Sequence, residues 1–196
     1  MTQLLVYTRN VFLRYAIDSL TDEHNSVTYF DNRVQFLACA TVIDNAVLLI
    51  DAINDPDNSV RWLDFRLKKH KTMRSINYLV PITMLANSFM SGLPLIAETF
   101  HLKSLCYFAR SRYSSNAKKS LYVEIINKLS STLSVEDYFL IRLLYSKTSG
   151  ECKGLTRREL NKIYYIRKKK LNLNSSLEFN QLILFLSNHT AMQSSF

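Results

Sequence analysis

The side chains of this sequence best suited to chemistry are cations, and they are crowded into one short stretch. Residues 145–196 carry nine basic and three acidic side chains, which supplies +6 of the formal net charge of +9. All nine basic residues fall between Lys147 and Lys170. Guanidinium and ammonium groups at this density bind phosphate, so the stretch predicts contact with a polyanion such as nucleic acid. The alternative is a solvated basic surface that has no ligand.

The segment from Thr156 to Lys170 has helical periodicity and would expose most of these cations. A helix can enter the major groove of DNA only if its outer face carries donors for phosphates and base edges. The residues that we expect on this face are Arg157, Arg158, Asn161, Lys162, Tyr165, Lys168, Lys169 and Lys170. The two arginines and Asn161 are suited to purine edges, and the three consecutive lysines to the phosphate backbone. The residues expected to face a small core instead are Leu160, Ile163, Tyr164 and Leu171.

Two motifs mark this part of the sequence, one before the predicted helix and one that contains it. The first runs from Leu133 to Leu144 and opens with a Ser N-cap and an acidic first turn, and the second runs from Leu155 to Leu173. Together with the segment up to Phe179 they resemble the helix-turn-helix of LuxR-type transcription regulators. The resemblance implies that the ligand is double-stranded DNA. It also implies a homodimer or a heterodimer with another LuxR-type regulator.

The sequence departs from that family pattern in two places. The interval from Leu144 to Leu155 is shorter than the family's second helix requires. Arg167 stands where the family keeps an apolar residue, and Ile166 lies one position away. The short interval favours an alternative function, a protein-binding adaptor or anti-regulator that has lost autonomous DNA binding.

Before Ser130 the chain alternates short apolar runs with amphipathic segments. Strands are predicted at residues 3–7, 26–30, 46–50, 76–82 and 105–109, and helices at 12–20, 34–42, 60–74 and 117–129. This alternation predicts a parallel sheet covered on both faces. Its order resembles a receiver domain. We therefore expect an α/β receiver-like (flavodoxin-like) domain over residues 1–129, a polar boundary at 130–132, and an all-α helix-turn-helix domain over 133–196.

Asp51 ends the third predicted strand, which is the place of the phosphoacceptor in a receiver domain. Phosphorylation also needs a pair of carboxylates after the first strand to hold Mg²⁺, and this sequence has Thr8, Arg9 and Asn10 there. The family's lysine after the fifth strand corresponds to Arg110. We therefore expect neither phosphorylation nor a metal or other cofactor. The combination resembles auxiliary LuxR-type regulators of enterobacteria, including Rcs-type regulators, which implies control of surface structures such as capsule or fimbriae.

Little in the sequence favours an enzyme. The chain has only three glycines, no Gly-rich phosphate loop, and neither HExxH nor GxSxG, so we expect no catalytic residues. Its three cysteines are widely spaced and the first residues lack a secretory signal, which predicts reduced thiols in a cytoplasmic protein. The uncharged run 75–97 approaches the length of a membrane span, but Pro81, Gly92 and Pro94 interrupt it, so we expect no membrane contact.

Overall fold

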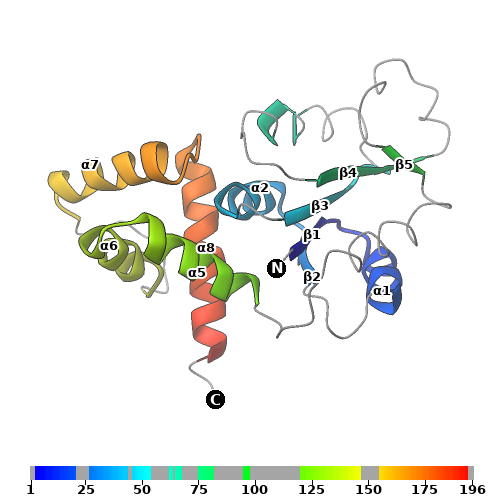
Figure 1. Ribbon diagram of the computed structural model, residues 1–196, viewed down its shortest axis with the longest axis horizontal. Helices are drawn as coiled ribbons and strands as arrows, with labels where there is room; N and C mark the ends of the chain where they lie inside the picture. The colour runs from blue at the N-terminus through cyan, green and yellow to red at the C-terminus, as the bar shows by residue number, and fades with distance from the viewer. Residues whose placement is uncertain are drawn as a thin grey trace. The chain divides into compact units, whose positions relative to one another are not determined.

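The computed structural model describes residues 3–20, 27–43, 46–53, 62–63, 65–67, 75–81, 95–97, 120–146 and 155–193 (Figure 1). The strands are β1 (Gln3–Tyr7), β2 (Val27–Phe30), β3 (Ala46–Asp51), β4 (Ser75–Val80) and β5 (Leu95–Ala97). The helices are α1 (Val11–Leu20), α2 (Arg33–Val42), α5 (Leu121–Thr132), α6 (Val135–Ser146), α7 (Arg157–Tyr165) and α8 (Ser176–Gln193). A π-helical turn, η3 (Ile166–Lys170), continues α7.

The chain forms two compact units. The first comprises Met1–Phe36 and Asp44–Lys119 and contains the sheet, while the second comprises Leu37–Ile43 and Ser120–Phe196 and contains α5 to α8. The polar residues 130–132, expected at the boundary between domains, form the last turn of α5.

The first unit is a mixed α/β structure built on one parallel sheet. The strand order is β2-β1-β3-β4-β5, and every pairing in it is parallel. Every residue of β1 is buried, and β3 is buried up to Asp51, as continuous apolar runs in a parallel sheet require. This is the order of flavodoxin-like sheets and is consistent with a receiver-like domain.

Both faces of the sheet carry a helix. On one face, Ile17 of α1 packs in a cluster with alternate residues of β1 and β3, among them Leu4 and Leu49. On the other face, Phe36 of α2 contacts the ring of Tyr7, at a distance of 5.8 Å between ring centroids. The parallel pairing of β1 with β3, in which Tyr7 lies opposite Ile50, places the carboxyl ends of the two strands side by side, where Thr8 and Asp51 lie.

Most of the predicted elements in the described residues are confirmed. The strands at 3–7, 26–30, 46–50 and 76–82 and the helices at 12–20 and 34–42 are present, with ends that differ by at most two residues. The helix predicted at 117–129 covers 121–132 instead, because Ser120 is its N-cap and accepts a hydrogen bond from the Val123 amide. The strand predicted at 105–109 lies outside the described residues. The sequence missed β5, which is only three residues long.

No helix among the described residues is long and apolar enough to cross a membrane. The uncharged run 75–97 begins with strand β4 and ends with strand β5. Cys39 is a free thiol whose pKa is raised by burial, so it is a poor nucleophile. Cys106 and Cys152 lie outside the described residues.

Candidate nucleic-acid interface

The basic segment of the second unit begins with a capping box that fixes the start of α7. The Glu159 amide donates to Thr156 Oγ1 at 3.3 Å, and Glu159 Oε2 accepts from the Thr156 amide at 2.7 Å. These bonds satisfy backbone donors that the first turn of a helix leaves unpaired. Arg157 and Arg158 are therefore held on the first turn of a well-defined helix.

Helix α6 packs against both α7 and α8, and α5 contacts α6. The buried apolar residues that join these elements include Leu140, Ile141, Leu144, Ile163, Ile166, Leu171, Leu173, Phe179 and Leu182. Ile166 is completely buried, which the sequence did not predict. By contrast, Leu160 is 45% and Tyr164 53% exposed, so the prediction that these two face the core is wrong. The predicted burial of Ile163 and Leu171 is confirmed.

The π turn η3 explains why Ile166 and Leu171 can both be buried. The Leu171 amide donates to the Ile166 carbonyl at 2.9 Å, so this bond spans five residues instead of the four of an α-helix. An uninterrupted α-helix would turn Leu171 toward solvent and lose about 1.5–3 kcal/mol of burial free energy. The segment ends at Asn172, whose left-handed backbone (φ 56°) is one that asparagine tolerates well.

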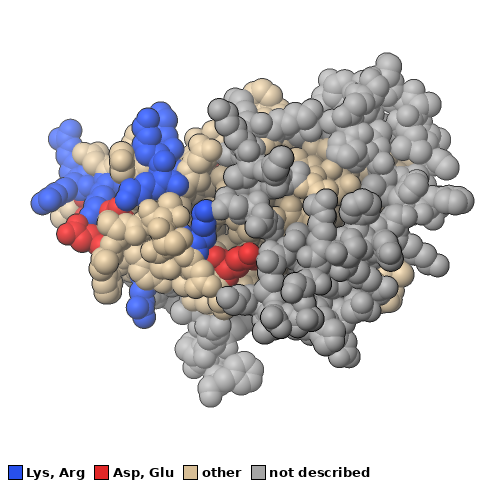
Figure 2. Space-filling model, viewed as in Figure 1, with Lys and Arg blue, Asp and Glu red and all other residues tan. Residues whose placement is uncertain are grey.

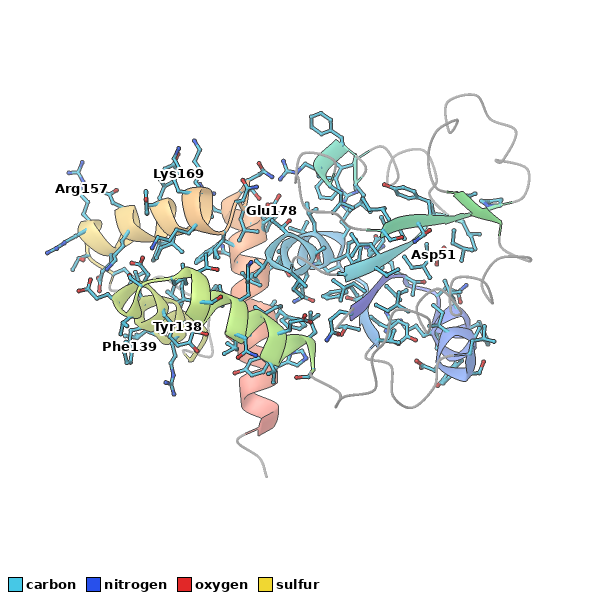
Figure 3. All side chains as sticks on the ribbon, in the orientation of Figure 1. Asp51, Tyr138, Phe139, Arg157, Lys169 and Glu178 are labelled. Carbon is cyan, nitrogen blue, oxygen red and sulfur yellow. The ribbon has the colours of Figure 1, made fainter. Side chains whose placement is uncertain are left out.

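The outer face of α7 and η3 carries most of the residues expected there. Arg157, Arg158, Asn161, Tyr165, Lys168 and Lys169 are all exposed. Lys and Arg side chains gather over this segment in Figure 2, and Figure 3 shows Arg157 and Lys169 pointing away from α6. Within the part of the chain that the structure describes, no ion pair involves Arg157, Arg158 or Lys169.

Lys162 and Lys170, which were expected on the same face, lie elsewhere. Both are only partly exposed and both reach Asp137 of α6, whose side chain is 7% exposed. Lys170 Nζ lies 2.9 Å from Asp137 Oδ2 and Lys162 Nζ lies 3.2 Å from Oδ1. Lys162 also pairs with Glu136 at 2.9 Å. These two cations are therefore neutralised by carboxylates of the chain and hold α7 and η3 onto α6.

The electrostatics of this network follow from the same contacts. Burial alone would raise the pKa of Asp137, but hydrogen bonds from Lys170, Ser134 and Lys162 outweigh it and lower that pKa. Lys162 lowers the pKa of Glu136, and the two carboxylates in turn raise the pKa of Lys162. All three groups are charged at neutral pH.

The aromatic ring of Tyr164 organises the cations beside it. Arg167 lies over this ring at 5.0 Å from its centroid and also donates to Ser176 Oγ at 3.0 Å. Lys168 donates to the Tyr164 hydroxyl at 3.2 Å, which lowers the pKa of that phenol. These contacts orient long side chains before any ligand arrives and reduce the entropy lost on binding.

A comparison of the chain with protein-family models, with curated proteins and with solved structures finds no match. The interpretation of the second unit therefore depends on its geometry, that is, on the exposed cations of α7 and η3 and on the apolar core behind them. The second helix, expected in shortened form between Leu144 and Leu155, falls mostly on residues 147–154, outside the described residues.

The place expected for a phosphoacceptor is closed by internal hydrogen bonds. Thr8 Oγ1 donates to Asp51 Oδ2 at 2.6 Å, and the Ile53 amide donates to Asp51 Oδ1 at 3.2 Å. Thr8 itself is buried and accepts from the Asn10 amide. A neutral hydroxyl thus occupies the place beside Asp51 where a metal-binding carboxylate would be needed. Arg110 lies outside the described residues.

Helix α8 packs an apolar stripe into the second unit. Phe179, Leu182, Ile183 and Leu186 are all buried, so they are core residues of this unit. The large apolar side chains that α8 exposes among its described residues are Leu177 and Leu184.

Sequence reasoning missed the role of Asp137. Lys162 and Lys170 are eight positions apart, which in an α-helix separates them by about 80° around the axis. No helical periodicity therefore indicates that they share a partner, and only the π turn brings them to the same side.

Proposed function

We propose that this chain is a DNA-binding transcription regulator that acts without phosphorylation and uses the outer face of α7 and η3 to contact duplex DNA. The observation that carries the proposal is the set of exposed cations on this face, Arg157, Arg158, Lys168 and Lys169, set on a helix whose opposite side is buried. The segment 157–170 would be about 21 Å long as an α-helix, and the major groove, about 12 Å wide, admits one.

The residues divide by position along the segment. Arg157, Arg158 and Asn161 lie at its start, and their donors suit base edges, above all guanine and adenine. Lys168 and Lys169 lie at its other end and would contact phosphates, which adds affinity without sequence preference.

Together with α6 and α8 this segment would form a LuxR-type helix-turn-helix. A second copy or another LuxR-type regulator would supply a second half-site. The resemblance extends the proposal to genes for surface structures such as capsule or fimbriae.

A titration of duplex DNA at several salt concentrations tests the proposal. Affinity should fall steeply with salt, because each phosphate contact contributes about −0.9 to the slope of log K against log salt. The double variant R157A/R158A should bind much more weakly, with a shallower slope. The matched control is R142A, because Arg142 is an exposed arginine of α6. Equal affinities for R157A/R158A and the wild type would refute the proposal.

An adaptor function is the second candidate, and one observation favours it. Val135, Phe139 and Leu143 form an i, i+4, i+8 row of exposed apolar residues on α6, and Val135 is 73% exposed. Figure 3 shows Phe139 pointing away from α7. For an adaptor, the titration would give no DNA affinity even at low salt. Association with a purified LuxR-type regulator would then be lost in F139S and retained in R157A/R158A.

A further inference from the structure

The π turn sets the direction of every side chain that follows it. An α-helix advances about 100° per residue, so a turn that accommodates one additional residue rotates the rest of the segment by about that angle. In η3 the additional residue falls within Ile166–Lys170, which contains three consecutive lysines.

Two pairs of residues report this rotation. Ile163 and Leu171 are eight positions apart, as are Lys162 and Lys170, so an α-helix would separate each pair by about 80°. If the π turn accommodates one of the intervening residues, the two members of each pair are effectively seven positions apart. Only about 20° around the helix axis then separates them. Both members of the first pair are buried, and both members of the second contact Asp137.

We propose that η3 is a one-residue insertion in the lysine run, and that it adds one outward-facing lysine to the DNA-binding surface. With one lysine removed, Ile166 and the following leucine would be four positions apart and share a face of an ordinary α-helix. The lysine before that leucine would still reach Asp137. One outward lysine would remain in place of the pair Lys168 and Lys169. The DNA part of this inference rests on the proposed function, whereas the insertion itself does not.

Deletion of Lys169 from the full chain tests the inference, with K169Q as the control that loses the same charge but keeps the register. The deletion variant should fold, with a thermal midpoint equal to or above that of K169Q, because the π turn is replaced by regular α-helical hydrogen bonds. Both variants should show the same shallower salt dependence in duplex titrations, with the slope of log K against log salt reduced by about 0.9.

Three results separate the ways in which this inference can fail. A thermal midpoint of the deletion variant several degrees below that of K169Q would show that packing needs the π turn and would overturn the insertion. Salt slopes equal to the wild type in either variant would overturn the outward lysine. A wild-type chain with no affinity for DNA would refute the proposed function and the role of the lysine, while the thermal comparison would still decide whether η3 is an insertion.

Discussion

Asp137 joins three segments of the second unit, because it lies in α6 and contacts Lys162 of α7 and Lys170 of η3. It lies in the first turn of α6, its side chain is nearly buried, and it accepts from Lys170 at 2.9 Å. Lys162 approaches its other oxygen at 3.2 Å. A carboxylate removed from water in this way is favourable only while its partners remain in place. Its loss would leave the partly buried Lys170 without its carboxylate and Lys162 with only the exposed Glu136.

Replacement of Asp137 by asparagine should therefore destabilise the second unit. We expect the free energy of unfolding to fall by about 1–2 kcal/mol. This loss is below the range for a fully buried ion pair, because both lysines keep some contact with water. Thermal unfolding of the full chain measures it. E136Q is the matched control: Glu136 also pairs with Lys162, but its side chain is 85% exposed, so its midpoint should stay close to the wild type. Equal midpoints for D137N and the wild type would contradict the role given to Asp137.

The same residue predicts a pH dependence. Because the pKa of Asp137 is lower in the folded than in the unfolded chain, its contribution to stability is complete above the unfolded pKa, near 3.9. It is lost as the pH falls through the lower, folded pKa. The difference in thermal midpoint between the wild type and D137N should therefore stay constant from pH 7 to about 5 and shrink below about pH 4. If the difference in midpoint already shrinks between pH 7 and 5, the pH dependence comes from another titrating group.

At the scale of elements, the capping box determines where α7 begins. Replacing Thr156 by alanine removes the oxygen that accepts a hydrogen bond from the Glu159 amide. The free energy of unfolding should fall by about 1 kcal/mol as a result. T156S keeps the hydroxyl and should behave as the wild type. Amide hydrogen exchange in the first turn of α7 measures the effect, because fraying there accelerates exchange. DNA affinity should fall with T156A, since Arg157 and Arg158 lose their fixed position. Unchanged exchange in T156A would show that the cap is dispensable.

Elements with strong local signals were predictable from the sequence, whereas elements set by distant contacts were not. Continuous apolar runs located β1 and β3, and helical periodicity from Thr156 to Lys170 located α7. Strand β5 has only three residues and is defined by its pairing with β4, so its own sequence carries no period.

The candidate site shows the same division. The exposure of Arg157 and Arg158 follows from helical periodicity alone. The inward direction of Lys162 and Lys170 depends on Asp137, in another helix, and on a π turn that breaks the period on which the prediction rests.

At the scale of the whole molecule, the net charge of the chain and the hydrogen bonds to Asp51 lead to one expectation. The chain carries a net charge of +9, concentrated near the proposed DNA-binding segment, so a polyanion is attracted without any prior activation. Asp51 already accepts hydrogen bonds from Thr8 and Ile53. We therefore expect acetyl phosphate with Mg²⁺ to leave both the mass and the DNA affinity of the wild-type chain unchanged. Phosphoryl transfer to Asp51 would contradict this.

Replacing Thr8 by aspartate tests the physical cause of that expectation. The new carboxylate would lie against Asp51, and repulsion between the two charges should cost about 1–3 kcal/mol in the absence of metal. Mg²⁺ prefers carboxylate oxygens, so adding it should raise the thermal midpoint of T8D but not that of the wild type. T8N, which has the same size without the charge, should not respond to Mg²⁺. If the wild type responds as strongly as T8D, the Thr8 hydroxyl does not keep Mg²⁺ from Asp51, and phosphorylation-independent regulation loses its structural basis.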